Sequence, residues 1–270
     1  MNILKIMQLL DFEKVDQDEV KILTDRRSFF KRASDVGMKA AITALPIALT
    51  MMPKVVRAQS SSVVETLNFA LTLEYLEDEF YKMGLSASGL IPSADRAIFM
   101  QISKHETAHV AFLKAALGTA AVQKPEFDFT AGGAFNSAFT DYATFITLSQ
   151  AFEDTGVRAY KGQAGNLVSD NGTLKAALQI HSVEARHASE VRRLRGALLS
   201  QNVKGWVTGN ESNGAPASIY AGEDNITHGG ASLNDISSLS SLSSSAKTEA
   251  FDEPLTKQQV LEIITPFLAV

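Results

Sequence analysis

Two histidines one helical turn apart, with a glutamate between them, raise the question of which chemistry this chain performs. The stretch "ISKHETAHVAFL" contains His105-Glu106-Thr107-Ala108-His109. This reads as H-E-x-x-H, the pattern in which two histidines bind zinc and the glutamate acts as a base. The same residues contain Glu106-x-x-His109, a unit with which helical bundles hold a pair of metal ions. The two patterns predict different sites, and the rest of the chain must decide between them.

The E-x-x-H unit occurs twice, in matching halves of the chain. Glu184 and His187 are three residues apart, as are Glu106 and His109, and residues three apart on a helix share a face. An earlier glutamate precedes each unit, Glu74 by 32 residues and Glu153 by 31 residues. Each of these two glutamates is in turn followed, seven residues later, by a tyrosine, Tyr81 and Tyr160 respectively. The repeat predicts two helical hairpins that each deliver Glu and then Glu-x-x-His to one central layer.

The composition restricts the ligands that any metal site could use. The chain has 270 residues and no cysteine. Disulfides, thiolate nucleophiles, Cys-ligated zinc and iron–sulfur centres are therefore excluded. A metal site must use His, Asp and Glu, which suits iron, manganese or zinc. Four glutamates would balance the charge of two divalent cations, and two histidines would add neutral nitrogen ligands.

The first 58 residues have the layout of an export signal. Arg26 and Arg27 precede the uncharged run 40–52, which is too short for a membrane span of about 20 residues. The segment resembles a twin-arginine signal, although Asp25 stands where Ser or Thr is usual. We expect folded export to the periplasm or another extracytoplasmic compartment through the twin-arginine machinery. An uncleaved N-terminal anchor is the alternative.

Removal of this segment makes the remaining chain more acidic. Residues 1–58 carry ten Lys/Arg and seven Asp/Glu, so the net charge of −5 becomes −8 over the remaining 212 residues. An acidic chain of this kind offers no basic surface for nucleic acid.

Four long segments show helical periodicity and few helix breakers. The predicted helices are 62–83, 93–117, 137–161 and 170–200. Ser93 is the expected N-cap of the second, and Gly84 and Gly118 are the expected stops of the first and second. A longer Gly- and Pro-containing loop joins the second and third helices. The sequence thus predicts an all-α protein, with an antiparallel four-helix bundle over 59–200 and a long crossover between helices 2 and 3.

Residues 201–270 form a different region, rich in Ser, Gly and Asn. We expect an irregular extension that ends in a short helix, "PLTKQQVLEIITPF", packed on the bundle through Val260, Ile263 and Ile264. Trp206 is expected to pin the extension to the bundle.

The helical stretches "LNFALTLEYLEDEFY", "KHETAHVAFL", "AFEDTGVRAY" and "HSVEARHA" resemble the ferritin-like superfamily. The words "YAGEDN" and "FDEPLTKQQVLEII" narrow the resemblance to its exported, desiccation-related branch, and the likeness covers nearly the whole chain after residue 58. The resemblance implies a carboxylate-bridged centre with two divalent ions, iron or manganese. Its ligands would be Glu74, Glu106, His109, Glu153, Glu184 and His187.

Five further residues are expected beside this ligand set: Glu77, Tyr81, Tyr160, His105 and His181. Glu77 competes with Glu74, or it is a further ligand that moves between redox states. The tyrosines would bond to ligands or carry electrons, although satisfied core tyrosines are equally expected. His105 and His181 are expected beside the ligand stripe, where each either bonds to a ligand or has no role in the site.

The expected chemistry is a redox reaction with peroxide or dioxygen, either catalase-like disproportionation or ferroxidase-like oxidation of ferrous ions. The expected partners are that small oxidant or metal ions, with a homodimer as a possible assembly. A non-enzymatic desiccation or stress protein with a structural or metal-buffering site is the first alternative. An H-E-x-x-H zinc hydrolase with Glu126 as third ligand is the second, and it leaves Glu184-x-x-His187 unexplained.

Overall fold

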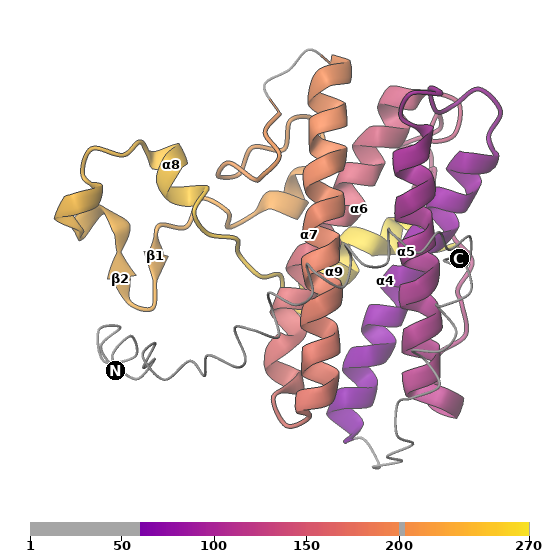
Figure 1. Cartoon of the computed structure of the whole chain (residues 1–270), viewed down its shortest axis with the longest axis horizontal. Coiled ribbons are helices and arrows are strands. Elements are labelled where there is room, and N and C mark those ends of the chain that lie inside the picture. Colours follow the sequence, from indigo (N-terminus) through magenta and orange to yellow (C-terminus); the bar gives the residue numbers. More distant parts are fainter. Residues whose placement is uncertain (1–59, 200–202, 270) are drawn as a thin grey trace, which may run out of the picture. The chain divides into compact units, whose positions relative to one another are not determined.

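Four long helices form the framework of the described chain. The computed structural model describes residues 60–199 and 203–269, and the predicted export signal lies outside them. The helices are α4 (Ser61–Ser86), α5 (Arg96–Leu117), α6 (Tyr142–Gln163) and α7 (Asn171–Leu199). They lie side by side in a bundle, with α4 paired to α5 and α6 paired to α7 (Figure 1). The predicted all-α bundle with its crossover between the second and third helices is confirmed. Within the described part, no helix combines the length and apolar content of a membrane span.

Helix α4 is longer than the sequence predicts. It begins after Ser60, whose hydroxyl accepts a hydrogen bond from the backbone N–H of Val63, the usual role of an N-cap serine. The predicted stop at Gly84 is wrong, because the helix continues to Ser86. Gly84 instead makes room for the ring of Phe145, which occupies the place where a β-carbon would stand.

Helices α5 and α6 begin later than predicted. Residues 93–95 form a turn, so Ser93 is not the N-cap of α5, whereas Gly118 ends that helix as predicted, with a φ of +56°. Helix α6 begins at Tyr142 because the Asp141 carboxylate accepts from the N–H of Thr144 at 2.8 Å. The turns before Asp141 belong to the crossover, which starts with the 3-10 helix η2 (Gly118–Ala120).

Two hydrophobic clusters fill the bundle, one toward each end. The cluster at the end where α5 and α6 begin is rich in aromatic rings, with Phe80 stacked on Phe145 at 4.8 Å between ring centroids. The cluster at the other end is mostly aliphatic and includes Leu67, Leu113 and Ile180. Between the two clusters lies a layer of buried acidic side chains, described below.

The chain after the bundle is mostly irregular, as predicted. Its elements are η4 (Ala217–Tyr220), η5 (Leu233–Asp235), η6 (Ser237–Leu239), α8 (Ser244–Thr248), α9 (Lys257–Ile264) and η7 (Thr265–Phe267), and η3 (Ala164–Leu167) joins α6 to α7. The sequence did not predict the short antiparallel strands β1 (Thr227–His228) and β2 (Ala231–Ser232). Helix α9 starts with a capping box between Thr256 and Gln259. It buries Val260, Ile263 and Ile264, as predicted.

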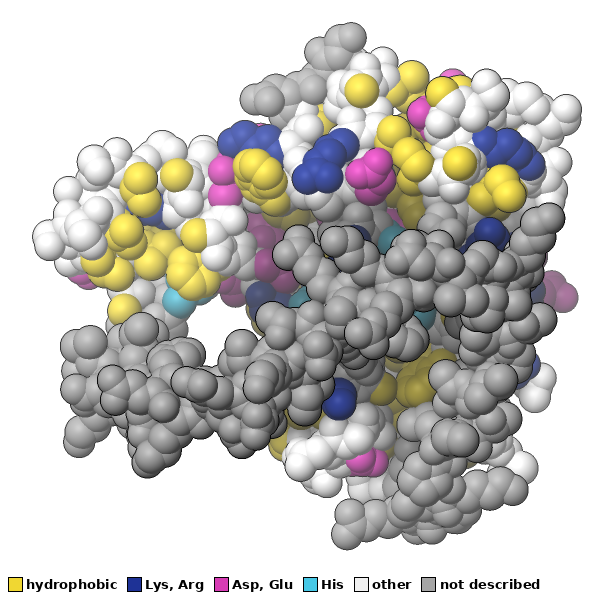
Figure 2. Space-filling view, viewed as in Figure 1, with side chains coloured by type: hydrophobic (Ala, Val, Ile, Leu, Met, Phe, Trp, Pro, Cys, Tyr) yellow, Lys and Arg dark blue, Asp and Glu magenta, His cyan; other side chains and the backbone are white. Residues whose placement is uncertain are grey.

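Charged side chains are mixed on the face of the bundle shown in Figure 2. Basic and acidic groups lie among apolar ones over its upper end. Apolar side chains also gather on the extension, where Ile236 and Leu242 are exposed.

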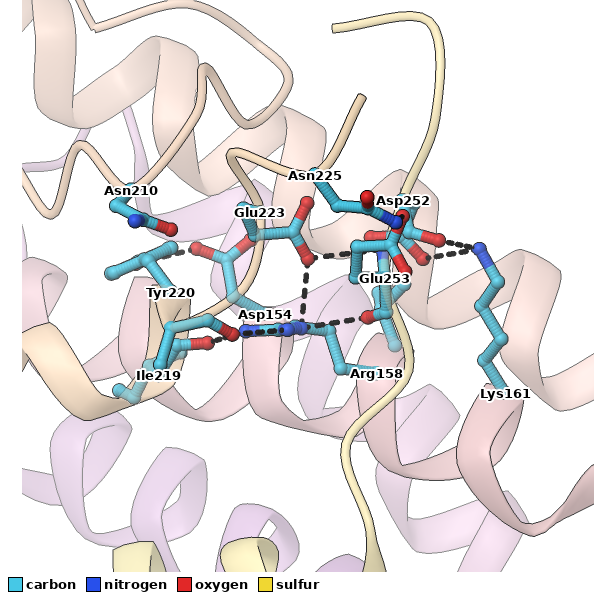
Figure 3. Close-up of polar contacts among 12 residues, drawn as sticks. Asp154, Arg158, Lys161, Asn210, Ile219, Tyr220, Glu223, Asn225, Asp252 and Glu253 are labelled. Carbon is cyan, nitrogen blue, oxygen red and sulfur yellow. Dashed lines mark hydrogen bonds and ion pairs between the residues drawn. The ribbon is translucent and has the colours of Figure 1, made fainter. Parts of the chain in front are cut away.

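Arg158 attaches the extension to the bundle (Figure 3). Its side chain is fully buried on α6 and donates to the backbone oxygens of Ile219, Ala221 and Glu253. Its Nε also lies 2.8 Å from the Glu223 carboxylate. The prediction for Trp206 is wrong, because this side chain is 53% exposed. The extension is therefore attached to the bundle by the buried guanidinium of Arg158, which donates to three carbonyl oxygens, instead of by the indole of Trp206.

A second buried network continues this contact along α6. Arg192 forms a two-fold ion pair with Asp154, at 2.9 and 2.6 Å, a geometry specific to guanidinium and carboxylate. The hydroxyl of Tyr220 donates to the same carboxylate at 2.7 Å and accepts from Gln150 at 2.9 Å. Helix α6 thus has one face toward the other helices and one toward the extension, which explains why every residue from Leu148 to Tyr160 is buried.

Replacing Gly162 with alanine is expected to destabilise the protein by about 1–3 kcal/mol. A β-carbon at this position would collide with the backbone carbonyl of Leu255, which cannot move as a flexible side chain could. This penalty outweighs the roughly 1 kcal/mol by which alanine favours a helix over glycine. Gly165→Ala is the matched control, because a β-carbon there meets nothing within 4 Å. Urea unfolding of both variants measures the difference, and equal stabilities would contradict the close approach.

Candidate metal centre

Each of the four bundle helices contributes one fully buried glutamate to the central layer. The four residues, none with any exposed surface, are Glu74, Glu106, Glu153 and Glu184. Burying one unpaired carboxylate is costly, and burying four together is more so because they repel one another. The layer therefore needs a source of positive charge.

The first group of ligand atoms surrounds the Nδ1 atom of His109. That nitrogen lies 3.2 Å from Glu74 Oε2, 3.1 Å from Glu106 Oε2 and 3.0 Å from Glu184 Oε1. A single N–H proton cannot serve three carboxylates. All four ligand atoms lie within 4.8 Å of one another.

The second group surrounds the Nδ1 atom of His187. This nitrogen lies 2.9 Å from Glu106 Oε1, 3.3 Å from Glu153 Oε2 and 3.4 Å from Glu184 Oε2. Glu106 and Glu184 therefore belong to both groups, and each directs one carboxylate oxygen to each group. Glu74 and Glu153 belong to one group each.

These spacings fit the coordination shell of a divalent ion. Ligand bonds of about 2.1 Å place neighbouring ligand atoms roughly 3.0 Å apart in an octahedron and roughly 3.4 Å apart in a tetrahedron. The distances from each histidine Nδ1 to the carboxylate oxygens around it, 2.9 to 3.4 Å, cover the same interval.

The hydrogen bonding of the cluster is incomplete in a way that a cation would complete. Five of its buried polar atoms make no hydrogen bond: Glu106 Oε1, Glu153 Oε2, Glu184 Oε1, Glu184 Oε2 and His187 Nδ1. These atoms lie close to one another, but the angles between them do not satisfy the geometry of a hydrogen bond. Buried polar atoms without partners are rare and often mark an ion that is not shown. The donor set of carboxylates and imidazoles suits iron or manganese.

The protonation equilibria of the cluster respond to this crowding. Burial, followed by the charge of Glu184, raises the pKa of Glu106 well above its usual range. Burial also raises the pKa of Glu153 to about 7. Burial would lower the pKa of both His109 and His187, but the surrounding carboxylates raise it overall. Without a cation, the cluster must hold extra protons to remain buried.

Two tyrosines bond across the bundle to the carboxylates that belong to one group only. Tyr81 of α4 donates to Glu153 Oε1 of α6 at 2.5 Å, and Tyr160 of α6 donates to Glu74 Oε1 of α4. Burial and the neighbouring carboxylate raise the pKa of both phenols, so each hydroxyl keeps its proton and acts as a donor. Each of these glutamates thus has one oxygen held by a tyrosine and one directed at a histidine.

Glu77 breaks the two-fold symmetry of the cluster. It is buried one turn after Glu74, and burial and the charges of the four layer carboxylates raise its pKa well above the usual range. The equivalent position one turn after Glu153 is Gly156. A β-carbon there would stand 3.2 Å from Glu77 Oε1. The glycine therefore leaves the space that a fifth carboxylate occupies.

His105 contacts the opposite half of the bundle instead of joining His109 at one metal. Its Nδ1 lies 2.8 Å from Nε2 of His187, and the two rings stack at 5.1 Å between centroids. If Nδ1 of His187 faces a metal, its Nε2 carries the proton and donates to His105. His105 then carries its own proton on Nε2, where the atom 2.6 Å away is Nε2 of Gln101, so this amide must turn to present its oxygen as the acceptor. The relation between His105 and His187 could not be deduced from H-E-x-x-H, which pairs His105 with His109.

Replacing His105 with alanine is expected to lower metal affinity about 10–100-fold, a typical effect of removing a hydrogen-bond partner of a metal-bound histidine. His181→Ala is the matched control. His181 is half-buried, and its Nδ1 is bonded to the backbone oxygen of Val157 at 3.0 Å, outside both groups. Competition with a chelator measures the affinities. Equal affinities for the two variants would show that His105 does not orient His187.

The structure brings together all six predicted ligands and leaves the zinc-hydrolase set apart. Within residues 60–199 and 203–269, two groups could hold an ion, and neither includes His105 or Glu126. Glu126 lies in the crossover, where its backbone oxygen accepts from Ala269 at 3.0 Å.

Comparison with known proteins adds one finding. A family model described as a ferritin-like domain matches residues 62–197, half of the chain, which take in nearly all of the four bundle helices. No curated protein matches the chain.

Proposed function

Because the chain belongs to the ferritin-like domain family, we propose that its buried cluster binds two divalent metal ions, iron or manganese. The loaded site would carry out redox chemistry on peroxide, dioxygen or ferrous iron. The observation that supports this most strongly is the sharing of Glu106 and Glu184 between the two groups of ligand atoms.

The residues divide into bridging and terminal ligands. Glu106 and Glu184 would bridge the two positions, since each directs one oxygen to each group. Glu74 and His109 would complete the first position, and Glu153 and His187 the second. Glu77 would offer a further carboxylate beside them, a role supported by its burial next to the four layer carboxylates.

The surrounding protein would control protons and water. Redox-active ions would supply electrons and Lewis acidity for the reaction with the oxidant. Tyr81 and Tyr160 hold protons at the outer oxygens of Glu153 and Glu74, where they fix the orientation of these carboxylates. The hydrophobic clusters on both sides of the layer would limit the access of water to the edge where the His109 side chain is partly exposed.

The absence of cysteine bears on the type of reaction. The chain has no thiol to relay electrons from a donor, so self-contained reactions are favoured. In peroxide disproportionation, two peroxide molecules give two waters and one dioxygen, and peroxide is both oxidant and reductant. In ferrous oxidation, the metal ions themselves are the reductant.

We also propose that the protein is exported, as the pattern around Arg26 and Arg27 suggests. Membership in the desiccation-related branch is part of the same proposal and rests on the sequence resemblance. Fractionation of cells that express the full chain tests the export, and recovery of the chain in the cytoplasm alone would contradict it.

Metal analysis tests the proposed function. Protein purified without added metal should contain about two iron or manganese ions per chain, the number that a carboxylate-bridged pair requires. Oxygen release from peroxide, or oxygen uptake with ferrous iron, should follow the metal content. Metal without turnover would favour a buffering role, and folded protein that binds neither metal would favour a structural role for the cluster.

A further inference from the structure

A cavity lies inside the bundle beside the candidate centre. All four helices line it, near the end where α4 and α7 begin, low in Figure 1. The centre of a water-sized sphere can move through about 20 Å³ of it. One water molecule needs roughly 10–15 Å³ on this measure, so the space suits a ligand of a few atoms.

The cavity lies close to the ligand layer. Leu113 and Ile180 line it, and each is four residues from a predicted ligand, His109 and Glu184 respectively. Four residues of helix span about 6 Å. Tyr160 belongs both to the wall of the cavity and to the layer, because its hydroxyl donates to Glu74.

The wall is apolar and its polar groups are largely occupied. Ten of the fourteen lining residues are aliphatic or phenylalanine, and the other four are Thr66, Tyr160, Gln163 and Thr173. The Tyr160 hydroxyl bonds to Glu74, the Gln163 amide oxygen accepts from Asn166, and the Thr173 hydroxyl donates to Asp170. A polar guest such as peroxide would lose hydrogen bonds to water without replacing them, at a cost of a few kcal/mol. A small apolar gas would lose none.

The two ends of the bundle differ in how tightly they are filled. On the cavity side, Ala70, Ala159 and Ala177 provide short side chains. On the opposite side, the ring of Phe145 packs against those of Phe80 and Phe99, with ring centroids 4.8 and 5.1 Å away respectively. The open space therefore lies on one side of the layer, next to Tyr160.

We propose that this cavity binds dioxygen at the candidate metal centre, on the side of Tyr160. The proposal rests on the proposed function, in which dioxygen is either the oxidant of ferrous iron or the product of peroxide disproportionation. The same site serves the entering and the leaving molecule, because its selectivity comes from size and apolar walls.

Xenon tests the site itself, without metal. A crystal of the metal-free full chain under xenon pressure should show xenon between Leu113, Tyr160 and Ala177. Ala177→Leu fills the cavity and should reduce xenon occupancy at least about tenfold, since empty apolar cavities take up xenon and the added side chain removes the space. Ala116→Leu is the matched control, because Ala116 is exposed on α5. Ala70→Val replaces Ala177→Leu if that variant does not fold. An unchanged chain without xenon at this position would overturn the proposal.

Kinetics then distinguish the two roles of dioxygen in the iron- or manganese-loaded chain. If dioxygen is the oxidant, Ala177→Leu should raise its KM several-fold in ferrous oxidation and leave oxidation by peroxide unchanged. If dioxygen is the product, the same variant should slow peroxide disproportionation several-fold. Unchanged rates in both assays would overturn the proposal. If the proposed function fails, the unchanged chain binds no metal and neither kinetic assay can be run. The chain can still bind xenon in that case, and the xenon-pressurised crystal then tests the cavity on its own.

Discussion

Replacing Glu106 with glutamine is expected to abolish metal binding at both positions at once. Its two oxygens face different histidines, Nδ1 of His109 at 3.1 Å and Nδ1 of His187 at 2.9 Å. An amide supplies neither the charge nor the second oxygen ligand. We expect affinity to fall by more than about 100-fold, above the range for residues that only support a ligand. Metal content per chain, measured after dialysis against a weak chelator, gives the result.

Two other glutamates provide the comparison for this variant. Glu74→Gln should impair only the first position, because Glu74 belongs to one group. Glu190→Gln should leave both intact, because Glu190 lies on the surface of α7 beside Arg193. Metal at 100 times its Kd should stabilise the unchanged chain by about 2.7 kcal/mol per site, and Glu106→Gln should lose this gain. Retention of one ion by Glu106→Gln would contradict the bridging role.

Replacing Arg158 with alanine is expected to cost about 3–5 kcal/mol of folding stability, as when one partner of a buried ion pair is removed. The variant leaves the buried Glu223 carboxylate without its cation and three backbone oxygens without a donor. The extension should then separate from α6 and become sensitive to protease. Chemical unfolding and limited proteolysis measure the two effects.

The loss should depend on pH because of Glu223. Burial raises the pKa of Glu223 to about 7, although Arg158 acts to lower it. In the unfolded chain a glutamate ionises near pH 4.3, so the folded state holds the extra proton between that value and about 7. Stability therefore falls as pH rises through this window, and the defect of Arg158→Ala should be larger at pH 8 than at pH 6.

Lys161→Ala is the control for this experiment. Lys161 is one turn from Arg158 and also bonds to the extension, at Asp252, but its side chain is 38% exposed. Exposed ion pairs contribute about 0–1 kcal/mol. If Lys161→Ala and Arg158→Ala are equally stable, the extension is not held by the buried guanidinium.

The sequence predicts the layer of ligands well because spacing on a helix fixes which residues share a face. Glu106 with His109 and Glu184 with His187 repeat at i, i+3, and the distance between halves is nearly constant. When a helix begins a few residues later than predicted, the same residues still share a face. Helix α6 starts at Tyr142 instead of residue 137, and Glu153 still faces the layer.

Contacts between helices are what the sequence does not disclose. Asp154, Arg158 and Arg192 look like ordinary surface charges at helical spacing, yet the extension covers them and buries all three. The need for a glycine at position 156 is explained by Glu77, which lies on another helix. The role of His105 likewise depends on a residue 82 positions away. In each case the role of the residue depends on a partner from a different helix or from the extension. The periodicity of the sequence within one helix does not reveal that partner.

Anomalous diffraction from crystals of the iron- or manganese-loaded protein would show whether the layer holds two metal ions. We expect two peaks, one bounded by Glu74, Glu106, His109 and Glu184 and the other by Glu106, Glu153, Glu184 and His187. Glu106 and Glu184 should reach both ions. A single peak held by His105 and His109, or no peak within the layer, would show that the buried carboxylates do not form a two-ion centre.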